Sequence, residues 1–310
     1  MMGNTIHNWD MLERGYTMHH AISQDKQGNI LATVSKTSAK IANGKDVRIN
    51  DFIIMMDPEK GEILQEWDLV HMLDSARYGM TDYDLTSDPF AQSASNWAHN
   101  NGIVEWGDDY LATARYQGIF KFNKAGGIEW IISPHGYWRD KYLKLLLNPL
   151  HADGTPITDP EVIAGTKNCD DFEWPWGCHT AVPLPNGHIL YFNNGYGRNF
   201  KLDFTDRKNI YTCGIEYEVD EVNRTVRQVW QYGKERGAAY FTPARSGVQY
   251  LEQTGNRLIC PGMSNVLSNG NRGARVTEVD PETQDVVFEL ELEDAIYQRV
   301  YRMSLYPENQ

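Results

Sequence analysis

Four β-rich segments of the chain repeat one pattern of hydrophobic and polar positions. Each begins with an apolar strand, a polar turn and a second apolar strand, and a later turn leads into an amphipathic strand. The first halves are HAISQDKQGNIL from His20, HNNGIVEWGDDYL from His99, HTAVPLPNGHIL from His179 and SGVQYLEQTGNRLI from Ser246. Repeated strand–turn–strand units are typical of β-propellers, whose blades each place their first strand along a central channel. The pattern predicts an all-β protein, a β-propeller with about four recognisable blade repeats.

The repeats start further apart than the roughly 40–45 residues of a minimal four-stranded blade. We assign the excess to two insertions between blade strands, residues 74–96 and 137–177, within a single domain of residues 1–310. The second insertion contains the apolar run KYLKLLLNPL, which we expect to form a short helix across one face. Long insertions between regular strands commonly form functional rims or lids.

Three histidines stand at the start of three repeats, where the fourth repeat has Gly247. Since the first strand of each blade faces the channel, we expect the imidazoles of His20, His99 and His179 to meet at the axis. Asn101 lies two residues after His99 and so faces the same side of its strand, and Arg115 follows on the next strand. Imidazoles, an amide and a guanidinium around one point would suit a tetrahedral oxyanion such as sulfate or phosphate.

Composition excludes several classes of function. The formal net charge of −13 and pI near 5.1 argue against a nucleic-acid partner, which requires a concentrated basic surface. No apolar run approaches the roughly 20 residues of a membrane span, so no membrane partner is expected. The first residues, MMGNTIHNWDMLERG, lack the apolar core of a signal peptide, which as written favours the cytoplasm. The four cysteines match no zinc template and are expected to be scattered thiols.

Several stretches of the chain resemble one known family. They are HNN with ARYQGIFKF, then FEWPWGCHTAV followed by NNGYGR, and IEYEVDEVNRTVRQVWQYGKERG. From about His19 to the C-terminus the chain is similar to the bacterial arylsulfate sulfotransferases that work without 3′-phosphoadenosine-5′-phosphosulfate (PAPS), which are six-bladed propellers. The resemblance implies transfer of a sulfuryl group from an aryl sulfate to a phenol through a sulfohistidine, with ping-pong kinetics. It implies small-molecule substrates, no cofactor, no metal, and a periplasmic or exported location.

The resemblance also assigns roles to individual residues. It places the nucleophile at His179 and the groups that bind the sulfuryl and aryl oxygens at His99, Asn101, Arg115 and one of the pair His19 and His20. The repeat register favours His20. Further substrate-binding candidates are Thr242 and Arg245, in the segment FTPARS, and the tryptophans that precede the nucleophile, which either pack in the core or wall an aryl-binding slot: Trp174 and Trp176.

The chain departs from the family pattern in three places. A signal peptide, an N-terminal β domain and further blades have no counterpart in this sequence. Of the two cysteines that form a short disulfide loop before the nucleophile, the first is matched by Asp159 and the second by Cys169, so we expect no disulfide there. Arg245 stands where the family has a threonine, which bears on the choice of acceptor.

Two other classes of function remain as alternatives. Three imidazoles can form an open metal site, which would make the protein a metal-dependent propeller hydrolase, although the guanidinium of Arg115 would repel a cation. A non-catalytic propeller that serves as a binding platform is the third reading, because fold alone does not determine function. The sequence leaves the oligomeric state open, with a homodimer among the options.

Overall fold

The structure is a computed structural model that describes residues 4–43, 46–77, 98–202, 205–264 and 266–297. Within these ranges four sheets account for most of the regular structure, and the helices are short. The expectation of an all-β protein is confirmed at this level. In the described part of the chain, no helix has the length and apolarity needed to span a bilayer.

Four strands of each sheet follow one another along the chain and pair with their neighbours in antiparallel order. The first sheet contains β1 (Tyr16–Gln24), β2 (Ile30–Asn43), β3 (Asp46–Met56) and β4 (Ile63–Asp68). The second contains β5 (Asn100–Trp106), β6 (Asp109–Ala114), β7 (Gly118–Phe122) and β8 (Ile128–Ile132). The third contains β10 (His179–Pro183), β11 (Ile189–Asn193), β12 (Cys213–Asp220) and β13 (Thr225–Tyr232). The fourth contains β14 (Gly247–Tyr250), β15 (Arg257–Cys260), β16 (Gly273–Val279) and β17 (Val286–Glu293).

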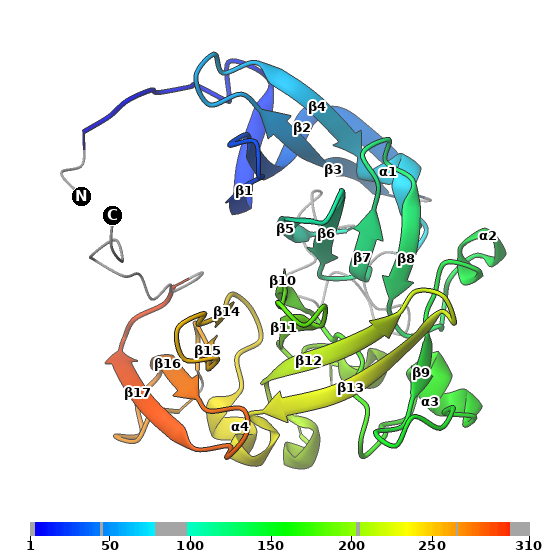
Figure 1. Ribbon diagram of the computed structural model, residues 1–310, viewed down its shortest axis with the longest axis vertical. Coiled ribbons are helices and arrows are strands. Elements are labelled where there is room, and N and C mark those ends of the chain that lie inside the picture. The colour runs from blue at the N-terminus through cyan, green and yellow to red at the C-terminus, as the bar shows by residue number, and fades with distance from the viewer. Residues whose placement is uncertain (1–3, 44–45, 78–97, 203–204, 265, 298–310) are drawn as a thin grey trace.

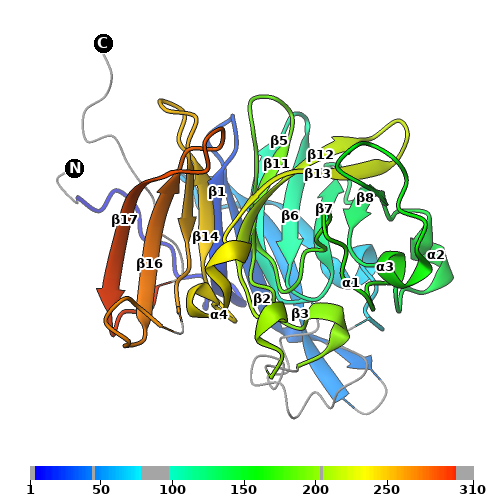
Figure 2. The same cartoon turned by 90° about the horizontal axis from the view of Figure 1, so that it is seen from below.

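The four sheets succeed one another around an arc, with the first strand of each sheet inside and the last strand outside (Figure 1). The inner strands touch in order, β1 against β5, β5 against β10 and β10 against β14. Figure 2 shows the same succession from below. Short α-helices and 3₁₀ turns lie between the strands in the described ranges: α1 (Leu69–Met72), α2 (Asp140–Leu143), α3 (Pro160–Ala164), α4 (Gly237–Tyr240), η1 (Arg198–Phe200), η2 (Arg207–Asn209) and η3 (Lys234–Arg236).

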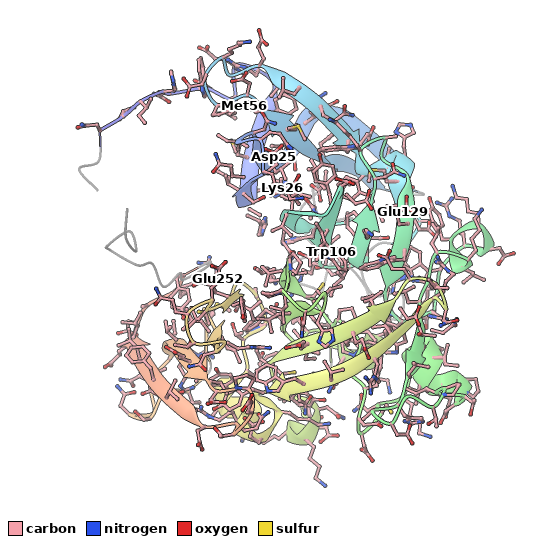
Figure 3. The ribbon with its side chains drawn as sticks, in the orientation of Figure 1. Asp25, Lys26, Met56, Trp106, Glu129 and Glu252 are labelled. Atoms are coloured by element: carbon pink, nitrogen blue, oxygen red, sulfur yellow. The ribbon has the colours of Figure 1, made fainter. Side chains whose placement is uncertain are left out.

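Polar turns and apolar strands give the sheets their form. In the β1–β2 turn, the Asp25 carboxylate accepts from the backbone N–H groups of Gln27 and Asn29 at 3.0 and 2.8 Å, and Gly28 supplies the positive φ of 88°. Lys26 in the same turn donates its Nζ to the Gly107 carbonyl at 2.7 Å, which ties the first sheet to the second (Figure 3). These contacts hold the inner ends of neighbouring sheets in place.

The hydrophobic core lies between neighbouring sheets. Leu31, Trp67 and Phe120 belong to one buried cluster shared by the first and second sheets. Trp130 and Tyr217 belong to another, shared by the second and third. Face-to-face packing of this kind buries large apolar side chains and fixes the relative position of the inner strands.

The insertion 137–177 differs from the expectation of a helix over KYLKLLLNPL. Within this run only residues 141–143 are helical, as part of α2, and the run ends in a fifth strand of the third sheet, β9 (Asn148–Leu150), which pairs parallel with β13. Asn148 precedes Pro149, and a residue before proline is disfavoured in helical backbone, which fits the extended conformation at this end of the run. In the other insertion, 74–96, residues 78–96 lie outside the described residues, and the division into one domain stays a prediction.

Candidate active site

The three histidines at the starts of the repeats converge. The His20 and His99 rings lie 4.6 Å apart between centroids, with their Nε2 atoms 3.1 Å apart. The His179 ring lies 6.2 Å from that of His20 and 6.5 Å from that of His99. His20 is exposed, His99 is half-buried and His179 is only 4% exposed, so the cluster reaches from an open side to a buried floor.

Irregular strand pairing directs these side chains toward one another. The pairing of β1 with β2 shifts between Met18 and Ile22, and that of β10 with β11 shifts between His179 and Ala181. His20 adopts a φ of 54° at its shift, and the corresponding shift in β5 follows His99, whose φ is 55°. Because a bulge re-aims the side chains beside it, simple alternation along the strand does not apply here.

Asn194, at the end of β11, holds the buried histidine. Its Oδ1 lies 2.6 Å from Nδ1 of His179, while its Nδ2 donates to the carbonyls of Thr242 and Arg245 at 2.9 and 3.1 Å. Since the two carbonyls can only accept, the amide nitrogen must face them, and the amide oxygen faces the imidazole. The oxygen accepts from Nδ1–H, which leaves the Nε2 lone pair of His179 for chemistry.

Burial keeps the central imidazoles neutral. Desolvation, followed by the charge of Arg115 and by His20, lowers the pKa of His179 well below its ordinary value, against the raising effect of Asn194. Desolvation, His20 and Arg115 lower the pKa of His99 in the same direction. A neutral imidazole with a free Nε2 is the form in which histidine acts as a nucleophile.

A line of polar groups leads from the cluster to a buried carboxylate. His20 Nδ1 lies 3.1 Å from His19 Nδ1, and His19 Nε2 lies 3.6 Å from Oδ1 of Asp51, which is 1% exposed. The other oxygen of Asp51 accepts from the backbone N–H of Asn100 at 3.1 Å. With the His20–His99 contact, these distances form a chain from Asp51 through His19 and His20 to His99. His20 therefore belongs to the cluster of three histidines, and His19 lies between His20 and Asp51.

Arg115 and Asn101 lie beside the histidines but are also anchored to the fold. Arg115 is 2% exposed, donates to the Pro243 carbonyl at 2.7 Å and packs over the Tyr196 ring at 4.5 Å. Its backbone N–H donates to the His99 carbonyl at 3.0 Å. Asn101 donates to the Cys178 carbonyl at 2.8 Å and accepts from Thr113 at 2.6 Å, so its amide joins β5 to the residue before His179.

The remaining candidates make structural contacts. The Thr242 hydroxyl is buried between the Ala244 carbonyl at 3.0 Å and the Met263 N–H at 3.1 Å. Arg245 contributes its carbonyl to Asn194, with its backbone at a φ of 66°. Trp174 and Trp176 are each 3% exposed within the main core cluster, an arrangement that favours the packing interpretation over an aryl-binding slot.

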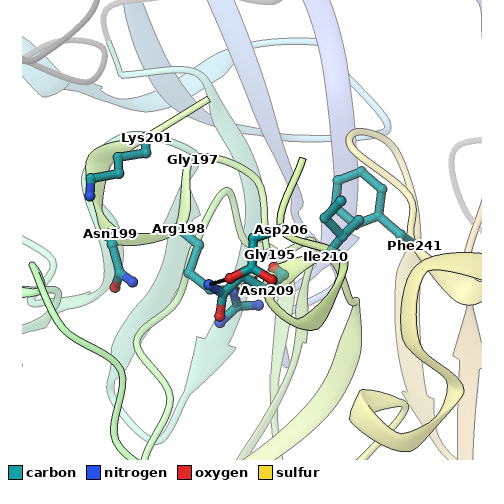
Figure 4. A pocket seen from close by; sticks show the side chains of 9 residues that line it. All are labelled: Gly195, Gly197, Arg198, Asn199, Lys201, Asp206, Asn209, Ile210 and Phe241. Carbon is teal, nitrogen blue, oxygen red and sulfur yellow. Dashed lines mark hydrogen bonds between the residues drawn. The ribbon is translucent and has the colours of Figure 1, made fainter. Parts of the chain in front are cut away.

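A pocket of about 180 Å³ is lined in part by Ile210 and Phe241 (Figure 4). Both residues pack in one buried cluster with Tyr196, the ring that Arg115 covers. The pocket's most prominent cation, Arg198, forms an ion pair with Glu173 and donates to the carbonyls of Asn209 and Tyr211. This guanidinium is therefore already used by the fold, and Lys201 is a second cation among the lining residues.

Two residues of the site, Asn194 and Asp51, were not found by sequence reasoning. The repeated NN dipeptide at the end of β11 is the only local signal for Asn194, and its partners lie 48 and 51 residues further along the chain. Asp51 lies within β3, directly before its apolar end, and by sequence alone a carboxylate there is typical of a solvated residue.

Comparisons with known proteins agree with the family resemblance of the sequence. The family model for arylsulfotransferases (ASST) matches residues 1–302. Two curated relatives, both called arylsulfate sulfotransferase AssT, come from Escherichia coli O6:H1 and Lelliottia amnigena, and each is 29% identical over 98% of this chain. The match covers 55% of either relative, so the chain spans about half the length of the curated relatives it matches.

Solved structures resemble the chain only weakly. A Bacteroides uniformis protein described provisionally as a 6-phosphogluconolactonase has a TM-score of 0.39 and 11% identity, over 92% of this chain and 74% of its own. At that score the resemblance carries no argument. The family model, in contrast, spans nearly the whole chain, and the stretches quoted for the resemblance include two of the three converging histidines, His99 and His179. The chain belongs to the arylsulfotransferase (ASST) family.

Proposed function

We propose that this chain, alone or within a longer protein, transfers a sulfuryl group from an aryl sulfate to a phenol, with His179 as the nucleophile. The observation that carries the proposal is the contact between His179 and Asn194, which presents a neutral imidazole with its Nε2 free, within reach of the positive charge of Arg115. The proposal includes a propeller fold, which the arc of sheets with inner first strands supports.

In the first half-reaction, Nε2 of His179 attacks the sulfur of the donor. The N–S bond forms as the S–O bond to the aryl group breaks, and the electron pair leaves on the phenolate oxygen. Arg115 carries fixed positive charge beside the sulfuryl oxygens and stabilises the charge they share in the transition state. The Nδ1–H of His179 stays bonded to Asn194, which stabilises the positive charge that develops on the imidazole.

The leaving phenolate needs a proton, and the exposed His20 and its neighbour His99 are the nearest donors. Burial and like charges disfavour protonation of His99 in the free protein. An incoming sulfate ester reverses that balance, because its negative charge favours the imidazolium form. The line through His19 to Asp51 supplies a buried negative charge that would stabilise the protonated relay.

The second half-reaction reverses these steps. An acceptor phenol gives its proton to the His20–His99 pair, its oxygen attacks the sulfur, and His179 leaves as a neutral imidazole. No nucleotide takes part, and donor and acceptor use the same site in turn. Steady-state rates measured at several concentrations of 4-nitrophenyl sulfate and phenol should therefore give parallel double-reciprocal lines. Intersecting lines, or dependence on PAPS, would contradict the proposal.

A metal-dependent hydrolase is the second candidate, favoured by one observation. One nitrogen from each of His20, His99 and His179 lies within 4.8 Å of the others, a spacing that could hold a divalent cation. The nearby Arg115 guanidinium opposes this reading through charge repulsion. Hydrolysis of the donor in the absence of phenol, raised by added zinc and abolished by chelator, would favour the hydrolase.

A further inference from the structure

A second group of metal-ligating side chains lies at the base of the insertion 137–177, away from the axial histidines. His151 Nδ1 lies 3.0 Å from Oδ1 of Asp171, and the Cys169 thiol donates to the same oxygen at 3.1 Å. All three ligand atoms lie within 4.8 Å of one another, and all three residues are half-buried. No catalytic role has been assigned to any of them.

We propose that His151, Cys169 and Asp171 bind a zinc-like divalent cation. Imidazole, thiolate and carboxylate are the ligands that zinc takes in proteins, with bonds of about 2.0–2.3 Å in tetrahedral geometry. Those bonds place the ligand atoms about 3.2–3.7 Å apart. The two contacts to Oδ1 of Asp171, at 3.0 and 3.1 Å, are close to this range, and the third pair lies within 4.8 Å. The half-exposed position leaves room for water as the fourth ligand.

The surroundings of the cluster favour a cation. The backbone N–H of Ala152 donates to Oδ2 of Asp171 at 2.9 Å, which fixes the carboxylate and leaves Oδ1 facing the other two ligands. An outer hydrogen bond of this kind is what orients a ligand in established metal sites. Asp153 is close enough for its charge to interact with both His151 and Asp171, and it adds negative potential at the site.

Binding exchanges protons for the metal. The hydrogen bonds from His151 and Cys169 to Asp171 each place a proton where the cation would sit. Burial raises the pKa of the Cys169 thiol, so the free protein carries that proton at neutral pH. Forming the metal–sulfur bond releases the thiol proton to water, and the imidazole proton moves through solvent from Nδ1 to Nε2. Affinity therefore rises with pH, as one proton leaves for each metal bound.

The bound cation would join two parts of the insertion 137–177 that are distant along the chain. His151 directly follows β9, which is fixed against β13, and Asp171 directly precedes Phe172 and the buried segment that leads to His179. A metal across this point joins the two ends of a loop of 17 residues, those between His151 and Cys169. The expected role is a structural clamp upstream of the nucleophile, independent of the proposed reaction.

Cobalt(II) tests the proposal directly, because a thiolate ligand gives an intense charge-transfer band that histidine and carboxylate ligands do not. Addition of one equivalent of cobalt to the reduced, metal-free protein should produce this band, and zinc should abolish it by displacement. Cys169→Ala should remove the band, and Asp171→Asn should weaken binding at least about tenfold, or 1.4 kcal/mol.

Three controls separate this site from other sources of signal. Cys260→Ala removes a buried thiol outside the cluster and should leave the band intact. His188→Ala disrupts a second histidine–carboxylate pair, in which Nδ1 of His188 lies 2.6 Å from Oε1 of Glu216. The band should persist in this variant as well. His179→Asn removes an axial histidine, and the band should persist. Absence of the band in the wild-type protein, or its survival in Cys169→Ala, would overturn the proposal and leave a hydrogen-bonded trio only.

Discussion

Removing Asn194 should impair catalysis through the tautomer of His179. Asn194→Ala deletes the acceptor 2.6 Å from Nδ1, so the imidazole proton is free to move to Nε2 and block the nucleophilic lone pair. The Gly177 carbonyl, 3.2 Å from the same nitrogen, retains part of the preference. Loss of about 1–2 kcal/mol of preference for the Nδ1–H tautomer lowers turnover by about 5- to 30-fold. This is less than the complete loss expected for His179→Asn.

Asn194→Ala should also lower stability, because the Thr242 and Arg245 carbonyls lose their buried donor. The cost is about 1–3 kcal/mol for the Arg245 carbonyl and smaller for the Thr242 carbonyl, which still accepts from the Thr212 hydroxyl at 3.4 Å. In a chain of this size, each kcal/mol shifts the melting temperature by about 2–4 °C. Activity must therefore be expressed per folded molecule at a temperature well below the transition.

Asn193→Ala is the matched control for this experiment. Asn193 is 0% exposed and makes two hydrogen bonds, donating to the Trp174 carbonyl at 2.9 Å and accepting from Gly195 at 3.0 Å. Its loss should lower the melting temperature to a similar degree while leaving turnover of the folded protein within about threefold. The ¹⁵N shifts of the His179 ring report the tautomer directly. Equal turnover in the two variants, with an unchanged tautomer, would refute the role assigned to Asn194.

Four further predictions follow from the same geometry. Arg115→Ala should lower kcat about 10²–10³-fold and still permit sulfation of the nucleophile, as pre-steady-state kinetics would show. Asp51→Asn should slow phenyl sulfate about tenfold more than 4-nitrophenyl sulfate, because only the poorer leaving group depends on the proton relay; an equal effect on both would exclude that relay. Folding lowers the pKa values of His99 and His179. Their contribution to the free energy of unfolding should therefore be constant above about pH 6.5 and decrease as the pH drops further, because these histidines then gain protons only in the unfolded chain. Acid denaturation curves would show this. Reduction with a phosphine should leave activity and melting temperature unchanged, since the structure has thiols at Cys169, Cys178, Cys213 and Cys260.

The sequence predicted the elements whose signals are local. Strand–turn–strand repeats depend on alternation and turn residues, and both are visible within about a dozen positions. The convergence of His20, His99 and His179 was predictable because the repeat brings equivalent strands to the same side. The bulges that aim these side chains were not, since strand pairing is decided by residues on the neighbouring strand.

The supporting residues of the site depend on contacts that are distant in the chain. Asn194 becomes informative only once Thr242 and Arg245 are known to lie against it. Asp51 gains its role from His19, which belongs to a different strand of the same sheet. The same limit explains β9, whose pairing with β13 spans 77 positions between Asn148 and Thr225. Local pattern cannot show such partners.

The central claim is that His179 carries the sulfuryl group during the reaction. The most direct measurement is mass spectrometry of the protein after incubation with 4-nitrophenyl sulfate and no phenol, followed by digestion at neutral to basic pH. The account predicts one added SO₃, about 80 Da, on the peptide containing HTAVPLPNGH, its loss on addition of phenol, and no adduct in His179→Asn. An adduct on His20 or His99 while His179→Asn remains active, or turnover with no adduct on any histidine, would contradict it.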